Sequence, residues 1–548
     1  MASVKAWSDE ARYSSEAIAR RAALDELISK INECEDQFGI ERIIRKASLY
    51  SKSDRSVLIG KVLARCKKLG VSLPRKVIED WLPKPNFKYS LTERGLAERM
   101  RDRYKGGLIW VPKLNTWMLW TGSYWRKAPK EEVRGFARRT VAELYEEASK
   151  SVGVGSETLS DFAKLCDRAK TYNAIVEIVQ SFTSEEGNVL VDAEDLDKEM
   201  CYFGVNNGEY DLQTQTFNPG VPSHYITKHT SVDYDPEAKC PYWDKKFLEI
   251  MGSQEMVDFM YRLFGCALTG DTGLNLLPIF FGVGANGKST VIRTFRRLFG
   301  AYSVTAQAAT FMKNPKGSNP GGARSDKIKL KGARLADVQE TDAGAKLSAS
   351  AVKEMTGDDN LTARAPYASE EVDFRPTAMI IFATNHKPEV DDQGYAMWRR
   401  LLPIHFKNLF DESKADTQLK HKVEAELPGI LNRLFAGYAD FKRRGRLDPP
   451  KEVLRERDIY KLESDPLAEW LEECCTITQD SDTKTRRSDL YQSWKNYAAD
   501  NVVSTYQMRK KWFSSSMKEK FPLVQDRRLG WCYLKVKIRD FTDFGENE

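Results

Sequence analysis

The sequence predicts an α/β protein whose main domain is built on a parallel sheet, and three observations support this class. Residues 277–281 form a short apolar run, residues 282–289 follow with the spacing G-x-x-x-x-G-K-S, and apolar residues then recur at helical intervals over 291–299. Two later apolar runs, within 333–340 and 377–385, have the length of buried strands. A chain of 548 residues is too long for one core, so three or four domains are expected.

Composition limits the possible classes of protein. The formal charge of +6 permits a polyanionic partner without requiring one. No apolar stretch approaches the length of a membrane span, and the first ten residues contain no apolar signal region, so we expect no membrane association. The nine cysteines include no C-x-x-C pair, which argues against a disulfide framework and against a zinc ribbon.

Changes of pattern along the chain predict four domains. Residues 1–84 read as helices and end at a proline-rich segment, and residues 85–234 read as a mixed α/β domain with a hairpin near 206–217. The domain that contains the glycine-rich loop is placed at 235–446 and a last domain at 447–548. Four tryptophans in 110–125 could form a stacking platform for nucleic acid, but half-buried core is the favoured interpretation for aromatic residues in short strands.

The glycine-rich loop after 277–281 predicts a site for a nucleoside triphosphate. Glycines let several backbone N–H groups approach the phosphate oxygens, a lysine supplies charge to the outer phosphates, and a serine hydroxyl is placed for Mg²⁺. The spacing alone arises by chance in roughly a few per cent of chains this long, but the strand before the loop and the helix after it lower that risk. We therefore expect ATP and Mg²⁺ as cofactors. The predicted nucleotide-binding residues are Gly282, Gly284, Asn286, Gly287, Lys288, Ser289 and Thr290, of which Thr290 has no assigned role.

Hydrolysis also needs a carboxylate, and the end of a neighbouring buried strand is the place where ligands meet a parallel sheet. Glu340 ends the run 333–340, although a surface glutamate would be the commoner interpretation of that segment in isolation. Asn385 ends the run 377–385 and could hold the attacking water or contact the γ-phosphate. Arg399 and Arg400 precede a further apolar strand at 401–406. Paired surface charges are the alternative for these arginines.

The order of these motifs resembles the superfamily 3 (AAA+) helicases, in particular the phage and plasmid primase-helicase group related to the poxvirus primase-helicase. The resemblance extends from about residue 91 to the C-terminus and rests on G-x-N-G-K-S-T, K-x-x-T-G-D-D, a strand ending in T-N, and W-R-R-L. It implies a hexameric ring in which Lys288 and Ser289 bind the nucleotide and magnesium. It also implies that Asn385 is the sensor residue, which contacts the γ-phosphate. It also implies that Arg399 or Arg400, without choosing between them, is an arginine finger.

The second motif departs from that group in one respect. Many members carry two adjacent acids there, whereas Gln339 precedes Glu340 in this chain. A single carboxylate, that of Glu340, is therefore expected to serve both magnesium and water. Asp337 is the alternative candidate for helping Glu340 in this role.

Two segments are predicted to contact DNA. By resemblance, the loop 364–370 lies in the channel of the ring, with Arg364 and Tyr367 as candidates, although a pair between Arg364 and Glu370 or Glu371 is equally consistent. Helices and strands after residue 464 follow the order of a winged helix. Its basic residues would meet phosphates, although such modules also bind proteins. The candidates in this domain are Arg509, Lys510, Lys511, Arg527 and Arg528.

Together these features predict an ATP-dependent replicative DNA helicase of a phage or mobile element. The resemblance implies that a homo-hexamer moves 3′ to 5′ along single-stranded DNA at a forked duplex. The expected compartment is the cytoplasm, which is that of the host cell if the source is viral. The D-x-D at 195–197 lies in a polar run, which leaves priming or synthesis to a separate primase or polymerase. The alternative is a DNA-binding initiator without processive unwinding. A small-molecule kinase would not explain the paired arginines.

Overall fold

The computed structural model describes residues 19–47, 50–151, 153–182, 189–313, 325–339, 346–357, 359–363, 371–390, 392–411, 416–501 and 508–539. Contacts divide the chain into two compact units, one of residues 1–121 with 125–196 and one of residues 122–124 with 197–548. The predicted boundaries between the four domains stay predictions.

The first unit is mostly helical and contains one small antiparallel sheet. After helical residues 19–33, its elements are α2 (Gln37–Arg45), α3 (Lys52–Lys68), α4 (Arg75–Trp81), α5 (Glu93–Arg103), β1 (Leu108–Val111), η1 (Pro112–Leu114), β2 (Thr116–Trp120), β3 (Trp125–Ala128), α6 (Lys130–Lys150), α7 (Val154–Cys166) and α8 (Ala169–Gln180). In the sheet β1-β2-β3, Trp117 and Trp125 are 3% and 1% exposed, and Trp110 packs on Trp117. The prediction that these tryptophans belong to the core is confirmed.

The second unit begins with the sheet β4-β5-β6, which contains the predicted hairpin. Its strands are β4 (Tyr202–Val205), β5 (Gly208–Asp211) and β6 (Thr216–Asn218), followed by η2 (Pro222–His224). Tyr210 stacks on Phe435 with ring centroids 3.8 Å apart, and buried Arg334 donates to the Tyr202 carbonyl at 2.7 Å. This sheet therefore shares its core with the region that follows, whereas the sequence analysis placed it in the preceding domain.

A five-stranded parallel sheet lies at the centre of this unit, in the order β13-β7-β12-β9-β8. Its strands are β7 (Leu277–Phe281), β8 (Ser303–Ala306), β9 (Leu335–Gln339), β12 (Met379–Thr384) and β13 (Leu401–His405), each parallel to its neighbours. Strands covered on both faces require near-continuous apolar sequence, which is why four of them were visible in the sequence. The exposed edge strand β8 was missed. The predicted α/β class is confirmed.

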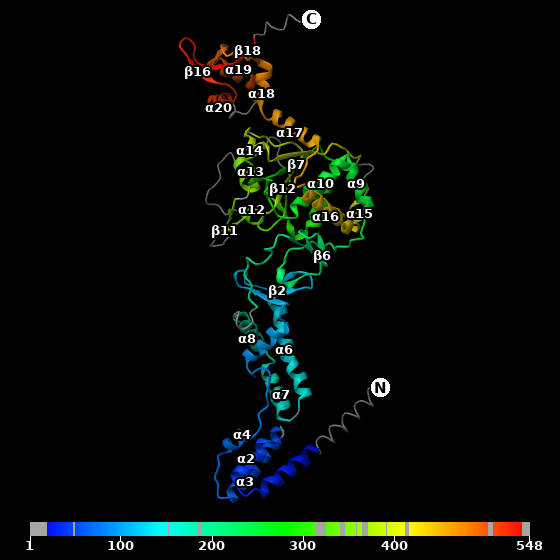
Figure 1. Cartoon of the computed structure of the whole chain (residues 1–548), viewed down its shortest axis with the longest axis vertical. Helices are drawn as coiled ribbons and strands as arrows, with labels where there is room; N and C mark the ends of the chain where they lie inside the picture. Colours follow the sequence, from blue (N-terminus) through cyan, green and yellow to red (C-terminus); the bar gives the residue numbers. More distant parts are fainter. Residues whose placement is uncertain are drawn as a thin grey trace. The chain divides into compact units, whose positions relative to one another are not determined.

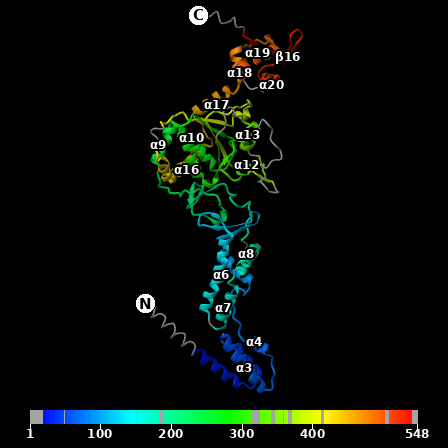
Figure 2. The same cartoon turned by 180° about the vertical axis from the view of Figure 1, so that it is seen from behind.

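Helices cover both faces of the parallel sheet. Figures 1 and 2 show α10 and α16 on one side and α12 and α13 on the other. The remaining elements here are η3 (Gly300–Tyr302), η4 (Ala308–Thr310), β10 (Leu361–Ala363) and β11 (Val372–Phe374). The helices are α9 (Pro241–Met251), α10 (Gln254–Ala267), α11 (Lys288–Phe299), α12 (Ser325–Ile328), α13 (Ala349–Thr356), α14 (Tyr395–Trp398), α15 (Leu419–Ala425), α16 (Leu427–Arg444) and α17 (Lys451–Glu463).

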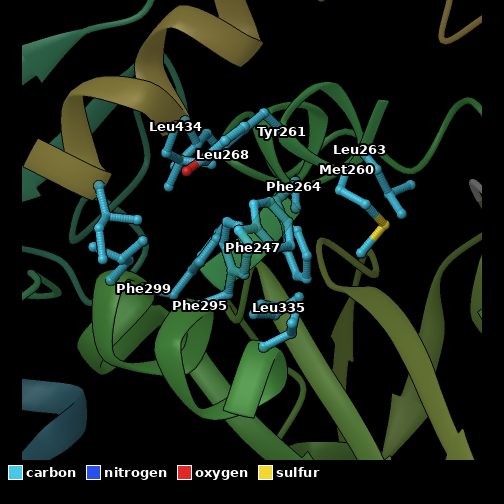
Figure 3. Packing of buried hydrophobic residues seen from close by; sticks show 14 of the residues in the cluster. Phe247, Met260, Tyr261, Leu263, Phe264, Leu268, Phe295, Phe299, Leu335 and Leu434 are labelled. Atoms are coloured by element: carbon cyan, nitrogen blue, oxygen red, sulfur yellow. The ribbon is translucent and has the colours of Figure 1, made fainter. Parts of the chain in front are cut away.

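The tightest helix pair, α10 and α16, depends on two glycines. A Cβ at Gly265 would lie 2.5 Å from the Tyr438 nitrogen, and one at Gly437 would lie 2.4 Å from the Tyr261 carbonyl oxygen. Below this pair the buried aromatic residues of α10 and α11 pack together, with the rings of Phe264 and Phe295 stacked at 3.6 Å (Figure 3). This core holds α11, the helix that follows the glycine-rich loop, against the sheet.

The C-terminal residues form a separate small core around Trp470, Trp494 and Phe513. Its elements are α18 (Pro466–Cys474), β14 (Cys475–Ile477), β15 (Lys484–Arg486), α19 (Arg487–Asp500), α20 (Lys510–Lys520), β16 (Leu523–Asp526), β17 (Gly530–Leu534) and β18 (Val536–Ile538). The predicted order of three helices and then two strands is present, with three further short strands. Among the described helices none is long and apolar enough to span a membrane.

Candidate functional site

The glycine-rich loop connects β7 to α11 and its backbone explains its composition. Gly282 has φ 146° and Gly287 has φ 81°, both in the region that favours glycine. A Cβ on Gly282 would lie 2.5 Å from the Phe406 carbonyl oxygen, and one on Gly287 would lie 2.7 Å from the Ile250 side chain. A Cβ on Gly284 would meet nothing, so this glycine leaves one side of the loop open.

The side chain of Asn286 stabilises the loop through two hydrogen bonds. This side chain is 3% exposed, accepts the Lys288 amide at 3.2 Å and donates to the Phe406 carbonyl at 3.3 Å. The Phe410 amide donates to the Ala285 carbonyl at 2.8 Å. The chain after β13 therefore supports the loop, and both polar atoms of the Asn286 side chain help to hold its shape.

Lys288 begins α11 and is the centre of the site. Its ammonium donates to the carbonyls of Gly282 and Thr384 and to Asn385 Oδ1, the first and last at 3.2 Å. The side chain is 8% exposed, and burial lowers the pKa of this ammonium. Since its three acceptors are neutral oxygens, Lys288 holds a positive charge that an anionic ligand would stabilise.

Asn385 follows β12, which lies between β7 and β9. Residues 288 and 385 are far apart in sequence, and the sheet order brings their side chains together. Of the remaining loop residues, Ser289 is exposed in the first turn of α11, and Thr290 lines a cavity of about 30 Å³ with Arg293 and Leu419. Helix N-termini favour anions because their first amides have no partner within the helix.

The predicted acid, Glu340, directly follows β9 and lies outside the described residues. Asp337, two positions before the end of β9, is 1% exposed. Its carboxylate lies 3.2 Å from the Arg296 guanidinium and accepts the Thr305 hydroxyl at 3.3 Å. Asp337 therefore links β9 to α11 and to β8, an arrangement that supports the position of α11.

We expect Asp337→Ala to lower the free energy of unfolding by about 2 kcal/mol, because it removes a buried carboxylate and leaves Arg296 without that partner. Urea unfolding of this variant, beside the control Asp458→Ala at an exposed position of α17, measures the change. Unchanged stability together with loss of ATP hydrolysis would contradict a positioning role and assign Asp337 to the chemistry.

The two arginines before β13 occupy different environments. Arg400 is 8% exposed and donates to the Thr356 hydroxyl at 3.2 Å, the Ala396 carbonyl at 2.6 Å and Asn275 Oδ1 at 3.0 Å. Arg399 is exposed, and its side chain makes no hydrogen bond or ion pair with the described residues. Tyr395, 81% exposed, stands one helical turn before Arg399. Two of the three partners of Arg400, Thr356 and Asn275, lie far from it in the sequence, so the sequence did not show that this arginine is enclosed.

The predicted DNA contacts divide into two groups. Arg364 and Tyr367 lie outside the described residues. Arg509, Lys510 and Lys511 are exposed at the start of α20, which has no acid in its first turn. Arg527 and Arg528 are exposed at the tip between β16 and β17. That tip is held by Asp526, whose carboxylate accepts the amides of residues 528 and 529, and these bonds lower its pKa to about 2.

The sequence analysis missed Trp531, which is 48% exposed beside this basic tip. An aromatic residue next to a basic turn is the signal that could have identified it. The described residues thus define an α/β protein with a glycine-rich loop at the carboxyl edge of a parallel sheet and a basic C-terminal region.

Two sequence families match this chain. Residues 97–252 match the family described as D5 N terminal like, and residues 280–400 match a family of unknown function, DUF5906. The second match extends from the end of β7 to Arg400 and so includes the glycine-rich loop.

Curated relatives come from large DNA viruses. Protein 184R of Invertebrate iridescent virus 6, named a helicase, is 26% identical over 396 residues, which are 64% of this chain and 39% of the relative. A protein of Acanthamoeba polyphaga mimivirus, also named a helicase, is 23% identical over 337 residues, 56% of this chain and 34% of the relative. A protein of African swine fever virus named a primase is 22% identical over 331 residues, 55% of this chain and 34% of the relative.

The chain therefore spans well under half the length of these relatives. Among solved structures, the apo C-terminal region of NrS-1 is 11% identical and covers 81% of this chain and all of that one, with a TM-score of 0.42 that does not establish a shared fold. The family and relative matches confirm the resemblance to phage and viral primase-helicases that the sequence motifs indicate.

Proposed function

We propose that this chain is the ATP-dependent motor of a viral or phage replicative DNA helicase. The observation that carries the proposal is the contact of 3.2 Å between Lys288 Nζ and Asn385 Oδ1. It joins the loop after β7 to the end of the adjacent strand β12. A γ-phosphate bound to the loop would there contact Lys288 on one side and Asn385 on the other. A role in replication agrees with the helicase and primase names of the relatives.

The first step of the proposed mechanism is binding of the nucleotide. The loop amides and the N-terminus of α11 surround the phosphates, while Lys288 exchanges its neutral acceptors for phosphate oxygens. The buried ammonium with its lowered pKa fits an anion at this position. Ser289 and Glu340 would hold Mg²⁺, which stabilises charge on the β- and γ-phosphates when bound. Glu340 orients the attacking water, and Asn385 contacts the γ-phosphate.

The second step concerns assembly. Arg399 is exposed and makes no side-chain contact with the described residues, so it is available to the nucleotide of a neighbouring copy. A guanidinium supplied from one subunit to the next couples hydrolysis to a ring. We propose a homo-hexamer that belongs to the superfamily 3 (AAA+) type and moves 3′ to 5′ along single-stranded DNA. The C-terminal region, proposed as a winged helix, would contact DNA phosphates with its basic residues.

Strand displacement from a forked duplex tests this function. The chain should separate a 3′-tailed fork with ATP and magnesium, in proportion to the ATP consumed, and should leave a 5′-tailed duplex intact. DNA-stimulated hydrolysis without displacement would instead support an initiator whose ATPase drives assembly. Separation of the 5′-tailed substrate alone would retain the motor and reverse its polarity.

A further inference from the structure

A cavity of about 250 Å³ lies between α6 and α8 in the first unit, far along the chain from the glycine-rich loop. These helices pack side by side, as Figures 1 and 2 show. Two arginines one helical turn apart on α6 contribute to the cavity, and Tyr172 and the start of α8 complete it. The lining residues are Glu131, Arg134, Gly135, Arg138, Ala169 and Tyr172.

The arginines of this cavity differ from others in the same unit. Arg99, Arg103 and Arg126 each pair with a glutamate. Arg134 instead has its Nε buried without a hydrogen-bond partner, and Arg138 makes no ion pair with the described residues. A buried donor without an acceptor costs about 1–3 kcal/mol, so the hydrogen-bonding capacity of the Arg134 guanidinium is not fully used by the protein around it.

The start of α8 adds a second, independent feature. Its first turn contains no acid, and the side chain of its N-cap residue, Arg168, makes no capping hydrogen bond. Arg168 and Lys170 are cations at the end of the helix where the helix dipole favours anions. Asp167 could have capped the helix, but its carboxylate accepts the Tyr172 hydroxyl instead. Ala169, the first residue of α8, lines the cavity, so the N-terminus of this helix lies beside the two arginines.

The size of the cavity indicates what it binds. Sites that enclose a whole small-molecule ligand measure roughly 300–1,000 Å³. At about 250 Å³, with the exposed Arg138 in its lining, this cavity suits one group of a longer polyanion. Glu131 is the single carboxylate in the lining and is exposed. A phosphodiester group fits this chemistry, since it accepts bonds from guanidinium and backbone donors together.

We propose that this cavity binds a backbone phosphate of single-stranded DNA through Arg134, Arg138 and the N-terminus of α8. The site is separate from the ATP site, and it rests on the proposed function only in taking DNA as the source of the phosphate. It would hold the strand on the first unit while the second unit consumes ATP.

Two variants of the full chain test the site in different ways. Arg134→Ala with Arg138→Ala removes the charge, and Gly135→Leu fills the cavity without changing charge. A Cβ at Gly135 meets nothing, and leucine favours a helix more than glycine does, so the second variant should melt no lower than the parent. The control is Arg139→Ala, an exposed arginine on α6 that rests on the Phe136 ring and does not line the cavity.

The readout is fluorescence anisotropy with a labelled single-stranded oligonucleotide over a range of salt. Both test variants should weaken binding about tenfold, as expected for the loss of charged hydrogen bonds. The charge variant should also reduce the slope of log Kd against log salt by about 0.7, the value for one phosphate on a single strand. The control should bind as the parent does.

Three results would overturn the proposal. If Gly135→Leu binds DNA like the parent, the cavity is not the site, whatever the arginine variant does. If the Gly135→Leu variant loses binding of inorganic phosphate in calorimetry while its DNA binding is unchanged, the ligand of the cavity is free phosphate. If all variants keep DNA affinity and DNA-stimulated hydrolysis, only this site fails, whereas a parent without DNA affinity would contradict the proposed function as well.

Discussion

Lys288→Ala is expected to reduce ATP hydrolysis by roughly 10²- to 10³-fold, the usual cost of removing one preorganised donor from a charged transition state. Strand displacement should fall below detection. Lys288 is the one charged side chain that contacts both the loop and Asn385 among the described residues, so no described neighbour can replace it. Steady-state phosphate release with and without DNA measures the effect.

The fold should survive this substitution. Lys288 makes three hydrogen bonds but keeps a charge buried beside neutral oxygens, and these contributions oppose each other. We expect the melting temperature to change by about 4 °C or less. Lys245→Ala, at an exposed lysine of α9, is the matched control and should hydrolyse ATP like the parent. Hydrolysis by a folded Lys288→Ala chain at the parental rate would exclude the loop as the catalytic site.

Arg399→Ala is the second change with a large expected effect. Turnover should fall by roughly 10³-fold, the lower end of the range for arginine fingers, with nucleotide affinity and melting temperature nearly unchanged. Arg400→Ala should behave differently, since its guanidinium is buried with three hydrogen bonds, and should lower the free energy of unfolding by about 2–4 kcal/mol. Turnover, nucleotide binding and thermal melting of both variants separate the two roles.

Mixing inactive chains tests whether Arg399 acts on a neighbouring copy. A Lys288→Ala chain retains Arg399, and an Arg399→Ala chain retains Lys288, so a mixed ring contains some complete sites. Hydrolysis should therefore reappear when the two variants are combined, although each is inactive alone. No recovery in a mixture that assembles normally would mean that Arg399 does not act between subunits.

Features that depend on neighbouring residues could be predicted from the sequence, whereas features that depend on contacts between distant segments could not. The glycine-rich loop was predictable because its conformation is local: Gly282 and Gly287 need φ values that other residues avoid, and the strand and helix beside them have their own periodicities. The fully buried strand β7 was visible for a similar reason, whereas the edge strand β8, which alternates polar and apolar residues over only four positions, had no such signal.

The C-terminal region was also predictable as a series of elements, since its helices each carry their own apolar stripe. Its exposed Trp531 was not, because a tryptophan in a strand is usually core and only packing decides whether it is covered. The hairpin of β5 and β6 was predicted from its turn residues, but its partner was not. The stacking of Tyr210 on Phe435 joins segments more than two hundred residues apart.

The sequence by itself determined the α/β class of the protein and the position of the glycine-rich loop between a strand and a helix, because backbone conformation and burial periodicity depend on a few neighbouring residues. Only the tertiary structure decided that β12 lies beside β7, which brings Asn385 to Lys288. It also decided that Arg400 is enclosed while Arg399 is exposed, and that the first unit contains a basic cavity between α6 and α8. The physical reason is that strand order, enclosure and cavities arise from contacts between distant segments, which no local pattern specifies.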